Sequence, residues 1–400
     1  MGVWEFLDRD LERLRSDNLY REPDDFDQRS ECEIRAAELG VNMLDASSND
    51  YLGYGSRAVS RETTASTFVP PHAARETLHP EAHVGAGASR LVHGTRPIHR
   101  ALEGELADWT RQPTALLFTS GYAANIGVLS ALPRAGDLIL SDALNHASIV
   151  DGCRLSRADV AVFAHLDAAA VENLLIRECP NRRVWLVTES YFSMDGDTPN
   201  LELLRHICDK HDAYLILDEA HALGVFGPHG SGLAHEHGVT PDILIGTFGK
   251  ALGAQGAFAS SSASVRNWLW NRARSFVYST APSPLLCERI LCNVRLARCD
   301  EANRTRLTRT VRYLRGRLND AGLRVPDGSH GPIVSVILGA PERALAAAKL
   351  LRERAILVQA IRPPTVAHGS ARIRVTVNAN LSQQDVERLA DAIVDTCGPS

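Results

Sequence analysis

The chain contains very little lysine. It has 400 residues, of which 43 are lysine or arginine, and three of these are lysine: Lys210, Lys250 and Lys349. Arginine keeps its proton near neutral pH and does not condense with an aldehyde, whereas a lysine amine can lose its proton and condense when its surroundings lower its pKa. Chemistry that needs a basic or nucleophilic amine therefore depends on one of these three positions.

Two of the three lysines lie in helical patterns. Lys210 in LRHICDKHD and Lys349 in RALAAAKLLRER fall on what the spacing indicates are exposed faces of amphipathic helices, so we expect both to be surface charges. Lys250 differs, because it follows the apolar run DILIG and lies among small residues in TFGKALGAQG. Lys250 is therefore the candidate for chemistry.

Long apolar runs are also missing. No segment approaches the ~18 apolar residues of a membrane span. Residues 1–20 alternate charged and apolar positions and lack the uninterrupted apolar stretch of a secretory signal. The eight cysteines form no CxxC pair, which indicates reduced thiols. We therefore predict a soluble, cytoplasmic protein that binds no membrane.

Several other classes of site lack their signature. The net charge is −5 and no long basic block is present, which argues against a dedicated nucleic-acid binder. DEAH (218–221) alone would suit a nucleotide-dependent helicase, but the GxxxxGK[ST] loop that it requires is absent. GAGAS (85–89) is too weak a match for a dinucleotide fingerprint. HPEAH (79–83) has a proline and a misplaced glutamate, so we expect no metal site.

The length exceeds what a single hydrophobic core usually supports, so more than one domain is expected. A charged helix is predicted over residues 3–16, within an N-terminal arm that ends with a short strand and turn at residue 56. Residues 57–82 are rich in Thr, Ser, Pro, Arg and His, which indicates a surface excursion. We predict a large domain over residues 57–290 and a smaller α+β domain over residues 291–400.

Short apolar runs alternate with helical patterns through the middle of the chain. Runs of about five residues separated by helix-length segments predict an α/β fold with a mostly parallel sheet covered on both faces. The six runs are TALLF (114–118), DLILS (137–141), RVWLVT (183–188), AYLILD (213–218), DILIGT (242–247) and GAFAS (256–260).

The last third of the chain predicts a different arrangement. An arginine-rich helical stretch runs from near Pro282 to about Leu318. Beyond it the patterns predict, in order, a strand at 333–338, a helix at 341–354, strands at 356–361 and 373–377, and a helix at 383–396 with Ser382 as its N-cap.

Polar residues follow the first five apolar runs. The segments are TSGYAAN, DALNHAS, ESYFSMDGD, DEAHALG and FGK. Ligands of open parallel sheets bind beyond the carboxyl ends of the strands, so residues at these positions meet at one edge. Five such segments together predict one pocket.

These residues meet the needs of an aldehyde cofactor that carries a phosphate and a pyridine ring. Lys250 would form the Schiff base. The glycine turn at Gly121 and Tyr122 opens a helix whose N–H groups suit a phosphate, and Thr247 offers a hydroxyl. Asp218, at the end of its run, would keep the pyridine nitrogen protonated.

Two histidines complete the set. His221 can reach where Asp218 reaches and would donate to the phenolic oxygen of the ring, and His146 would cover the exposed ring face. Either histidine taken alone is more often a structural residue than a ligand. The prediction of pyridoxal 5'-phosphate therefore depends on the order and spacing of the whole set.

The sequence resembles the α-oxoamine synthases, pyridoxal-phosphate enzymes of fold type I that condense an amino acid with an acyl-CoA and release CO2. The resemblance runs from about residue 41 to residue 389. It is carried by SSNDYLG, GTRPIHRALEGELADW, FTSGYAANIGVL, NHASIVDG, ESYFSMDGD, DEAHALGVFGPHGSG and TFGKALGAQG. It implies a large domain with a seven-stranded type of sheet, a small C-terminal domain, and a homodimer with shared active sites.

The resemblance also implies roles for matching residues. Catalytic roles would fall to Lys250, His146 and Asp218. The cofactor would be held by these three and by Gly121, Tyr122, Ser193, His221, Thr247 and, from the neighbouring subunit, Thr280. The amino-acid carboxylate would meet Asn49 and Arg374, and the acyl chain would pass Arg362 and Thr365.

Within the family, VQAIRPPTVAHGSARIRVTV is most similar to the branch that joins L-alanine to a pimeloyl thioester, carried by CoA or a carrier protein, in biotin synthesis. The alternatives are glycine with acetyl-CoA, serine with a long-chain acyl-CoA, a homologue from a natural-product pathway, and a non-catalytic partner subunit. Three features depart from the pattern. Tyr20 falls where an arginine for the pimeloyl end is expected, with Arg21 beside it; residues 57–82 are longer than expected; and ANL (379–381) replaces a more usual histidine.

Overall fold

The structure is a computed structural model that describes residues 4–21, 25–28, 30, 32–37, 40–56 and 84–398. The predicted surface excursion at residues 57–82 lies outside the described residues. The chain forms two compact units, here called the large unit (residues 57–193 and 198–304) and the small unit (residues 1–56, 194–197 and 305–400). The three-part division that the sequence predicts stays a prediction. None of the helices in the described part of the chain combines the length and hydropathy needed to cross a membrane.

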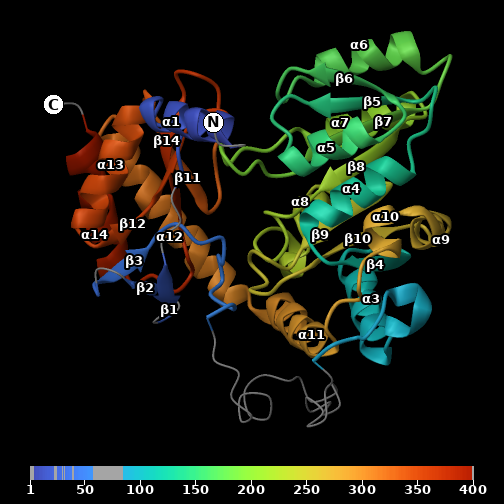
Figure 1. The fold of residues 1–400 in the computed structure, drawn as a ribbon, viewed down its shortest axis with the longest axis horizontal. Helices are drawn as coiled ribbons and strands as arrows, with labels where there is room; N and C mark the ends of the chain where they lie inside the picture. Colours follow the sequence, from blue (N-terminus) through green and yellow to red (C-terminus); the bar gives the residue numbers. More distant parts are fainter. Residues whose placement is uncertain are drawn as a thin grey trace. The chain divides into compact units, whose positions relative to one another are not determined.

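A seven-stranded sheet lies in the large unit (Figure 1). Its strands stand in the order β4-β10-β9-β8-β7-β5-β6, and only β10 runs antiparallel to its neighbours. The strands are β4 (Thr114–Phe118), β5 (Leu138–Asp142), β6 (Asp159–Phe163), β7 (Val184–Glu189), β8 (Tyr214–Asp218), β9 (Ile243–Thr247) and β10 (Ala257–Ser261). The predicted α/β fold with a mostly parallel, seven-stranded sheet is confirmed.

Helices precede, connect and follow these strands. They are η1 (Arg90–Gly94), α3 (Pro97–Trp109), α4 (Gly121–Ala131), α5 (Ala147–Leu155), α6 (Ala168–Glu178), α7 (Leu201–Lys210), η2 (Pro228–Gly230), α8 (Leu233–Glu236), α9 (Ala263–Arg272), α10 (Arg274–Val277) and α11 (Pro284–Cys299). Ser120 caps α4 by accepting from Ala123 N at 3.1 Å, and His146 caps α5 in the same way. Helix α4, which follows β4, and helix α5, which follows β5, are therefore each fixed at their first residue by a side-chain cap.

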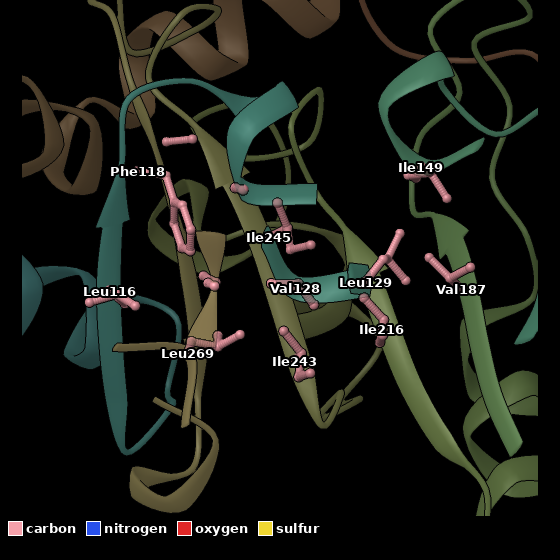
Figure 2. Packing of buried hydrophobic residues seen from close by; sticks show 14 of the residues in the cluster. Leu116, Phe118, Val128, Leu129, Ile149, Val187, Ile216, Ile243, Ile245 and Leu269 are labelled. Atoms are coloured by element: carbon pink, nitrogen blue, oxygen red, sulfur yellow. The ribbon is translucent and has the colours of Figure 1, made fainter. Parts of the chain in front are cut away.

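One face of the sheet packs against α4, α5, α9 and α10. Figure 2 shows part of this buried cluster from close by. Val128 and Leu129 of α4 and Ile149 of α5 lie in one buried cluster with Val187 of β7 and Ile216 of β8. Side chains along a strand alternate between the two faces. Asp218 therefore shares this face with Ile216, and Glu189 shares it with Val187.

The opposite face is covered as well. Leu117, Leu217 and Leu244 alternate with the clustered residues and are also buried. Helix α3 contacts β4, and α7 contacts β8. Burial on both faces explains why the central strands are continuous apolar runs.

The small unit carries two sheets. One has the order β1-β2-β3-β12 and the other β11-β14-β13. Its elements are α1 (Glu5–Ser16), β1 (Phe26–Gln28), β2 (Glu33–Ala36), β3 (Asn42–Asp45), α12 (Glu301–Asp320, which begins in the large unit), β11 (Ile333–Gly339), α13 (Pro341–Glu353), β12 (Ile356–Leu357), β13 (Gln359–Ile361), β14 (Ala371–Thr376) and α14 (Gln383–Cys397). Ser382 caps α14, and Asp385 bonds back to Ser382 N at 3.0 Å, so the predicted N-cap is confirmed.

Two predicted elements are wrong in detail. The single strand predicted at 356–361 is divided at Val358, because β12 pairs with β3 whereas β13 pairs with β14 of the other sheet. The continuous helical stretch predicted from Pro282 breaks at Asp300, whose ψ of 56° is not helical. Strand β6, an edge strand whose side chains are mostly exposed, was not predicted, although VAVFA (160–164) is an apolar run of similar length.

The tight packing of β9 leads to a stability prediction. A Cβ placed on Gly246 would lie 2.3 Å from Leu223 Cδ1 and 2.6 Å from Phe258 Cε1, and both of these side chains are buried. We expect Gly246→Ala to lower the free energy of unfolding by about 2 kcal/mol, because overpacking forces buried groups to move. Urea unfolding of the two proteins measures the difference.

Gly104→Ala is the matched control. Gly104 is exposed inside α3, and a Cβ there would meet nothing within 4 Å. The same substitution should therefore raise the free energy of unfolding by about 0.5–1 kcal/mol, because glycine is unfavourable inside a helix. A Gly246→Ala protein as stable as the parent would contradict the packing described for β9.

Candidate active site

The carboxyl ends of four parallel strands carry the candidate site. Asp142 ends β5 and His146 follows it, Glu189 ends β7, Asp218 ends β8, and Thr247 ends β9. Glu189 and Asp218 are direct neighbours in the pairing of β7 with β8. These strands are parallel, so all of these residues belong to one edge of the sheet in the large unit.

Asp218 is a buried carboxylate with donors on both oxygens. Its side chain is 6% exposed. Asn125 of α4 donates from Nδ2 to Oδ2 at 2.7 Å, and the Ala220 N–H donates to Oδ1 at 2.8 Å. Two N–H donors, one on each oxygen, suit the ionised form of the acid. The arrangement is what a partner for a protonated pyridine nitrogen requires.

His146 lies at the N-terminus of α5, and its ring is part of the cap. Ser148 N donates to His146 Nδ1 at 3.2 Å, and Ser148 Oγ lies 2.8 Å from the same nitrogen. Burial lowers the pKa of His146; the charge of Lys250 lowers it further, and the charge of Asp218 opposes both. A neutral imidazole is therefore favoured at this position.

Glu189 is a second acid beside Asp218. Its Oε1 accepts from His146 N at 2.7 Å, and the residue is 4% exposed. Burial raises the pKa of Glu189 to about 8, with a further rise from the negative charge of Asp218 and an opposing effect from Lys250. The protonated form of Glu189 is therefore favoured at neutral pH.

Lys250 lies in the connection between β9 and β10. Its carbonyl accepts from Gly253 N at 2.8 Å, and Ala254 N donates to Phe248 O at 2.8 Å, so the chain turns tightly around it. The side chain is half-buried, and its charge acts on the pKa values of both His146 and Glu189. Lys250 is therefore brought to the same strand edge as the two acids and the histidine.

The predicted phosphate residues lie beside one another. Gly121 is the first residue of α4, and a Cβ on it would come 3.7 Å from Thr247 Cβ. Thr247 Oγ1 donates to Gly256 O at 3.0 Å. Tyr122 is 45% exposed, and its hydroxyl bonds Asp151, which raises the pKa of the phenol. A helix N-terminus with a neighbouring hydroxyl suits a phosphate.

Three further predicted cofactor residues also belong to the large unit. His221 is buried in the turn that follows β8, and Ser193 is half-buried in the segment that follows β7. Thr280 is exposed and forms an isolated bridge with Ser89. The roles assigned to these three residues stay predictions.

The predicted substrate residues lie in the small unit, in two groups. In the first group, Arg374 of β14 donates to Asn49 Oδ1 at 3.0 Å, and Tyr51 OH bonds the same oxygen at 3.3 Å. Burial raises the pKa of Tyr51 to about 12, although Arg374 opposes the rise. Arg374 thus presents a buried cation supported by neutral partners.

The second group lines a cavity of about 680 Å³. Arg21 donates to Thr365 Oγ1 at 3.1 Å, and Arg362 bonds the carbonyls of Asn18 and Tyr20. Burial lowers the pKa of Arg362, and the charge of Arg21 adds to this effect. Two guanidinium groups close enough to repel one another make the cavity suitable for an anion.

The sequence did not single out three residues of the site. Asn125, Ser148 and Glu189 stand inside the motifs TSGYAAN, DALNHAS and ESYFSMDGD, yet no role followed from their spacing. Asn125 joins α4 to both β8 and α5, which depends on contacts between elements. A carboxylate at the last position of an apolar run was the available signal for Glu189.

Together these residues fit an aldehyde cofactor with a pyridine ring and a phosphate. Lys250 could bind the aldehyde, Asp218 the ring nitrogen, and the N-terminus of α4 with Thr247 the phosphate. His146, held neutral, is a flat group that could lie on an electron-poor ring without adding a positive charge.

Comparison with known proteins agrees with this site. Residues 47–393 match the model of the family described as aminotransferase class I and II. A protein of Bacillus velezensis described as putative 8-amino-7-oxononanoate synthase 2 is 40% identical over 382 residues, which cover 96% of this chain and 94% of that protein. The 8-amino-7-oxononanoate synthase of Anaeromyxobacter dehalogenans is 43% identical and covers 85% of this chain and 83% of its own length. The solved structure of Sphingomonas wittichii serine palmitoyltransferase has a TM-score of 0.86 and 26% identity, covering 99% of this chain and 98% of that one.

The raised pKa of Glu189 gives a pH prediction. The acid keeps its proton up to about pH 8 in the folded state, against an ordinary value of 4.5. The folded protein therefore binds more protons than the unfolded chain over this range, and Glu189 costs stability as the pH rises. Glu189→Gln keeps an oxygen for His146 N but has no charge to bury. We expect its stability relative to the parent to improve by about 4 kcal/mol between about pH 5 and about pH 9.

Thermal and urea unfolding at the two pH values measure this change. Glu387→Gln on the exposed side of α14 is the control, because its partner Gln383 carries no charge, and it should show no such pH dependence. If the Glu189→Gln protein follows the parent at both pH values, Glu189 is not the protonated acid of the site.

Proposed function

Because the chain belongs to the class I and II aminotransferase family, whose cofactor is pyridoxal 5'-phosphate, we propose that it is an 8-amino-7-oxononanoate synthase. The reaction joins L-alanine to a pimeloyl thioester and yields 8-amino-7-oxononanoate, CO2 and the free thiol of CoA or a carrier protein. The observation that carries the proposal is the meeting of Asp218, His146 and Lys250 at one strand edge. Relatives of 40–43% identity that bear this name support it.

When bound, the cofactor supplies an electron sink for the negative charge that develops at the substrate carbon. Asp218 holds a proton on the ring nitrogen, which keeps the ring electron-poor. Burial and two N–H donors fix Asp218 in place without a competing cation. Glu189 supports this arrangement because it is protonated and leaves the negative charge to Asp218.

Lys250 has two tasks in the proposal. Its amine binds the aldehyde of the cofactor, and after the amino acid has taken that place the same amine removes the proton from the α-carbon of alanine. The half-buried position of Lys250 and the tight turn around it keep the amine at the strand edge. His146 covers the ring and keeps water from it.

Substrate recognition is assigned to the small unit. Arg374 and Asn49 bind the carboxylate of alanine, since Arg374 is buried and has neutral partners. The anionic end of a pimeloyl chain suits the cavity with Arg21, Arg362 and Thr365. The enzyme works as a homodimer in this proposal, with Thr280 reaching the cofactor phosphate of the neighbouring subunit.

A second candidate is a condensation of serine with a long-chain acyl thioester. It is favoured by the likeness to the Sphingomonas wittichii serine palmitoyltransferase structure over nearly the full length of both chains. Thiol release measured with alanine, glycine and serine against pimeloyl, acetyl and palmitoyl thioesters separates the candidates. We expect the alanine and pimeloyl pair to give the highest kcat/KM; a higher value for serine with palmitoyl thioester would overturn the first proposal in favour of the second.

The role of Lys250 is tested by reduction with borohydride. In the cofactor-loaded protein we expect borohydride to remove the visible absorption band and to fix the cofactor on Lys250, as read by mass spectrometry of the peptide that contains it. Lys250→Ala should bind no cofactor covalently and should lose turnover. Lys210→Ala is the control, because Lys210 pairs with Glu172 on the surface and should leave labelling and turnover unchanged. Label found at another residue would refute the assignment.

The role of Asp218 is tested by Asp218→Asn. The amide cannot hold the ring nitrogen in its protonated form, so we expect kcat/KM to fall by about 100-fold or more, as for other electrostatic groups of catalytic sites. Asp209→Asn, an exposed change on α7, is the control. Near-normal turnover of the Asp218→Asn protein would remove the electron-sink role.

A further inference from the structure

A continuous chain of hydrogen bonds joins Asp218 to His146 through two side chains. Asn125 Nδ2 lies 2.7 Å from Asp218 Oδ2 and 3.0 Å from Ser148 Oγ. Ser148 Oγ lies 2.8 Å from His146 Nδ1. All four residues belong to the large unit, and Asn125 and Ser148 are 2% and 1% exposed. Water therefore has little access to the middle of the chain.

Each donor in this chain can be assigned from elementary chemistry. An ionised carboxylate only accepts hydrogen bonds, so Asp218 requires the NH2 group of Asn125 to face it. The second hydrogen of that group then points to Ser148 Oγ, which must accept it. The hydroxyl hydrogen of Ser148 remains available for His146 Nδ1.

His146 Nδ1 receives a second donor. The main-chain N–H of Ser148 points to it at 3.2 Å, because His146 is the N-cap of α5. A nitrogen that accepts from an N–H carries no proton of its own. The proton of a neutral His146 ring is therefore on Nε2.

The charged groups around His146 are consistent with a neutral ring. Asp218 at the end of β8 favours the imidazolium, whereas Lys250 in the β9–β10 connection disfavours it, and burial is the largest effect. Glu189 at the end of β7 bonds the main-chain N–H of His146 and is itself influenced by Asp142 of β5. Ser148 forms both hydrogen bonds to Nδ1 of the His146 ring, and neither Glu189 nor Asp142 takes part in them.

We propose that Asn125 and Ser148 are positioning residues, which hold His146 as a neutral imidazole with its proton on Nε2 and tie that state to the ionised Asp218. Its value for catalysis rests on the proposed function. A neutral ring can lie on a protonated pyridine without the repulsion between two cations. It also keeps one donor, Nε2–H, whose hydrogen cannot move to Nδ1 while Ser148 occupies that nitrogen.

The proposal is tested on the tautomer itself. Nitrogen NMR of the full-length protein with isotope-labelled histidine, in cofactor-free and cofactor-loaded forms, reports which ring nitrogen carries the proton. His146→Gln identifies the signal. At neutral pH we expect an unprotonated Nδ1 and a protonated Nε2 for His146. An imidazolium, or a proton on Nδ1, would overturn the proposal.

The dependence on Ser148 is tested by Ser148→Ala and Ser148→Thr. Loss of the hydroxyl should raise the titration midpoint of His146 by about one pH unit, the shift expected for one hydrogen bond to the neutral form. Ser148→Thr keeps a hydroxyl and should restore the midpoint. Ser130→Ala in α4 is the control, because Ser130 Oγ bonds the Ile126 carbonyl. An unchanged midpoint in Ser148→Ala would overturn the role of Ser148.

The role of Asn125 is tested by Asn125→Leu, which removes the bridge to Asp218. We expect cofactor affinity, followed by absorption on titration of the cofactor-free protein, to fall about tenfold, and the His146 midpoint to change with it. A changed affinity with an unchanged midpoint would mean that Asn125 supports Asp218 alone and would refute the link. These readings need no acyl substrate. A failed thiol-release assay with an intact tautomer would therefore sink the proposed function and leave this inference standing.

Discussion

The rest of the site depends on one negative charge placed inside the end of a sheet. Asp218 is 6% exposed, and a carboxylate so placed is costly unless donors reach both of its oxygens. Asn125 and Ala220 supply those donors. The neighbouring acid, Glu189, meets the same surroundings with one N–H donor and a raised pKa, so the pair carries a single charge.

This charge organises elements that are distant in the sequence. Asn125 comes from α4, His146 and Ser148 from the start of α5, and Lys250 from the connection beyond β9. The apolar cluster between the sheet and helices α4 and α5 fixes the distance between these helices and the strands (Figure 2). The polar contacts at the strand edge are therefore consequences of close packing further along the same face.

Much of this architecture follows from the sequence, and the reasons for the exceptions are physical. Strand β4 was predicted residue for residue, because strands buried on both faces are continuous apolar runs. Strand β6 was not predicted although VAVFA (160–164) is an apolar run as well, and the exposure of Val160 and Val162 shows that such a run alone does not report burial. At Val358 the chain passes from one sheet to the other, because β12 pairs with β3 and β13 pairs with β14. This pairing depends on residues distant in the sequence, so no local pattern predicts it. The roles of Asn125 and Ser148 could not be predicted for the same reason, since they depend on the contact between α4 and α5.

The antiparallel direction of β10 has a consequence for how the lysine is held. Other connections at this strand edge lead into helices, such as α4 after β4 and α5 after β5. Residues 248–256 instead return directly into the neighbouring strand, where Thr247 and Ala257 are paired. Both ends of this segment are thereby anchored at one residue pair of the β9–β10 ladder. An insertion or deletion within residues 248–256 would therefore displace the amine of Lys250. The length of this segment is more constrained than that of an ordinary surface loop.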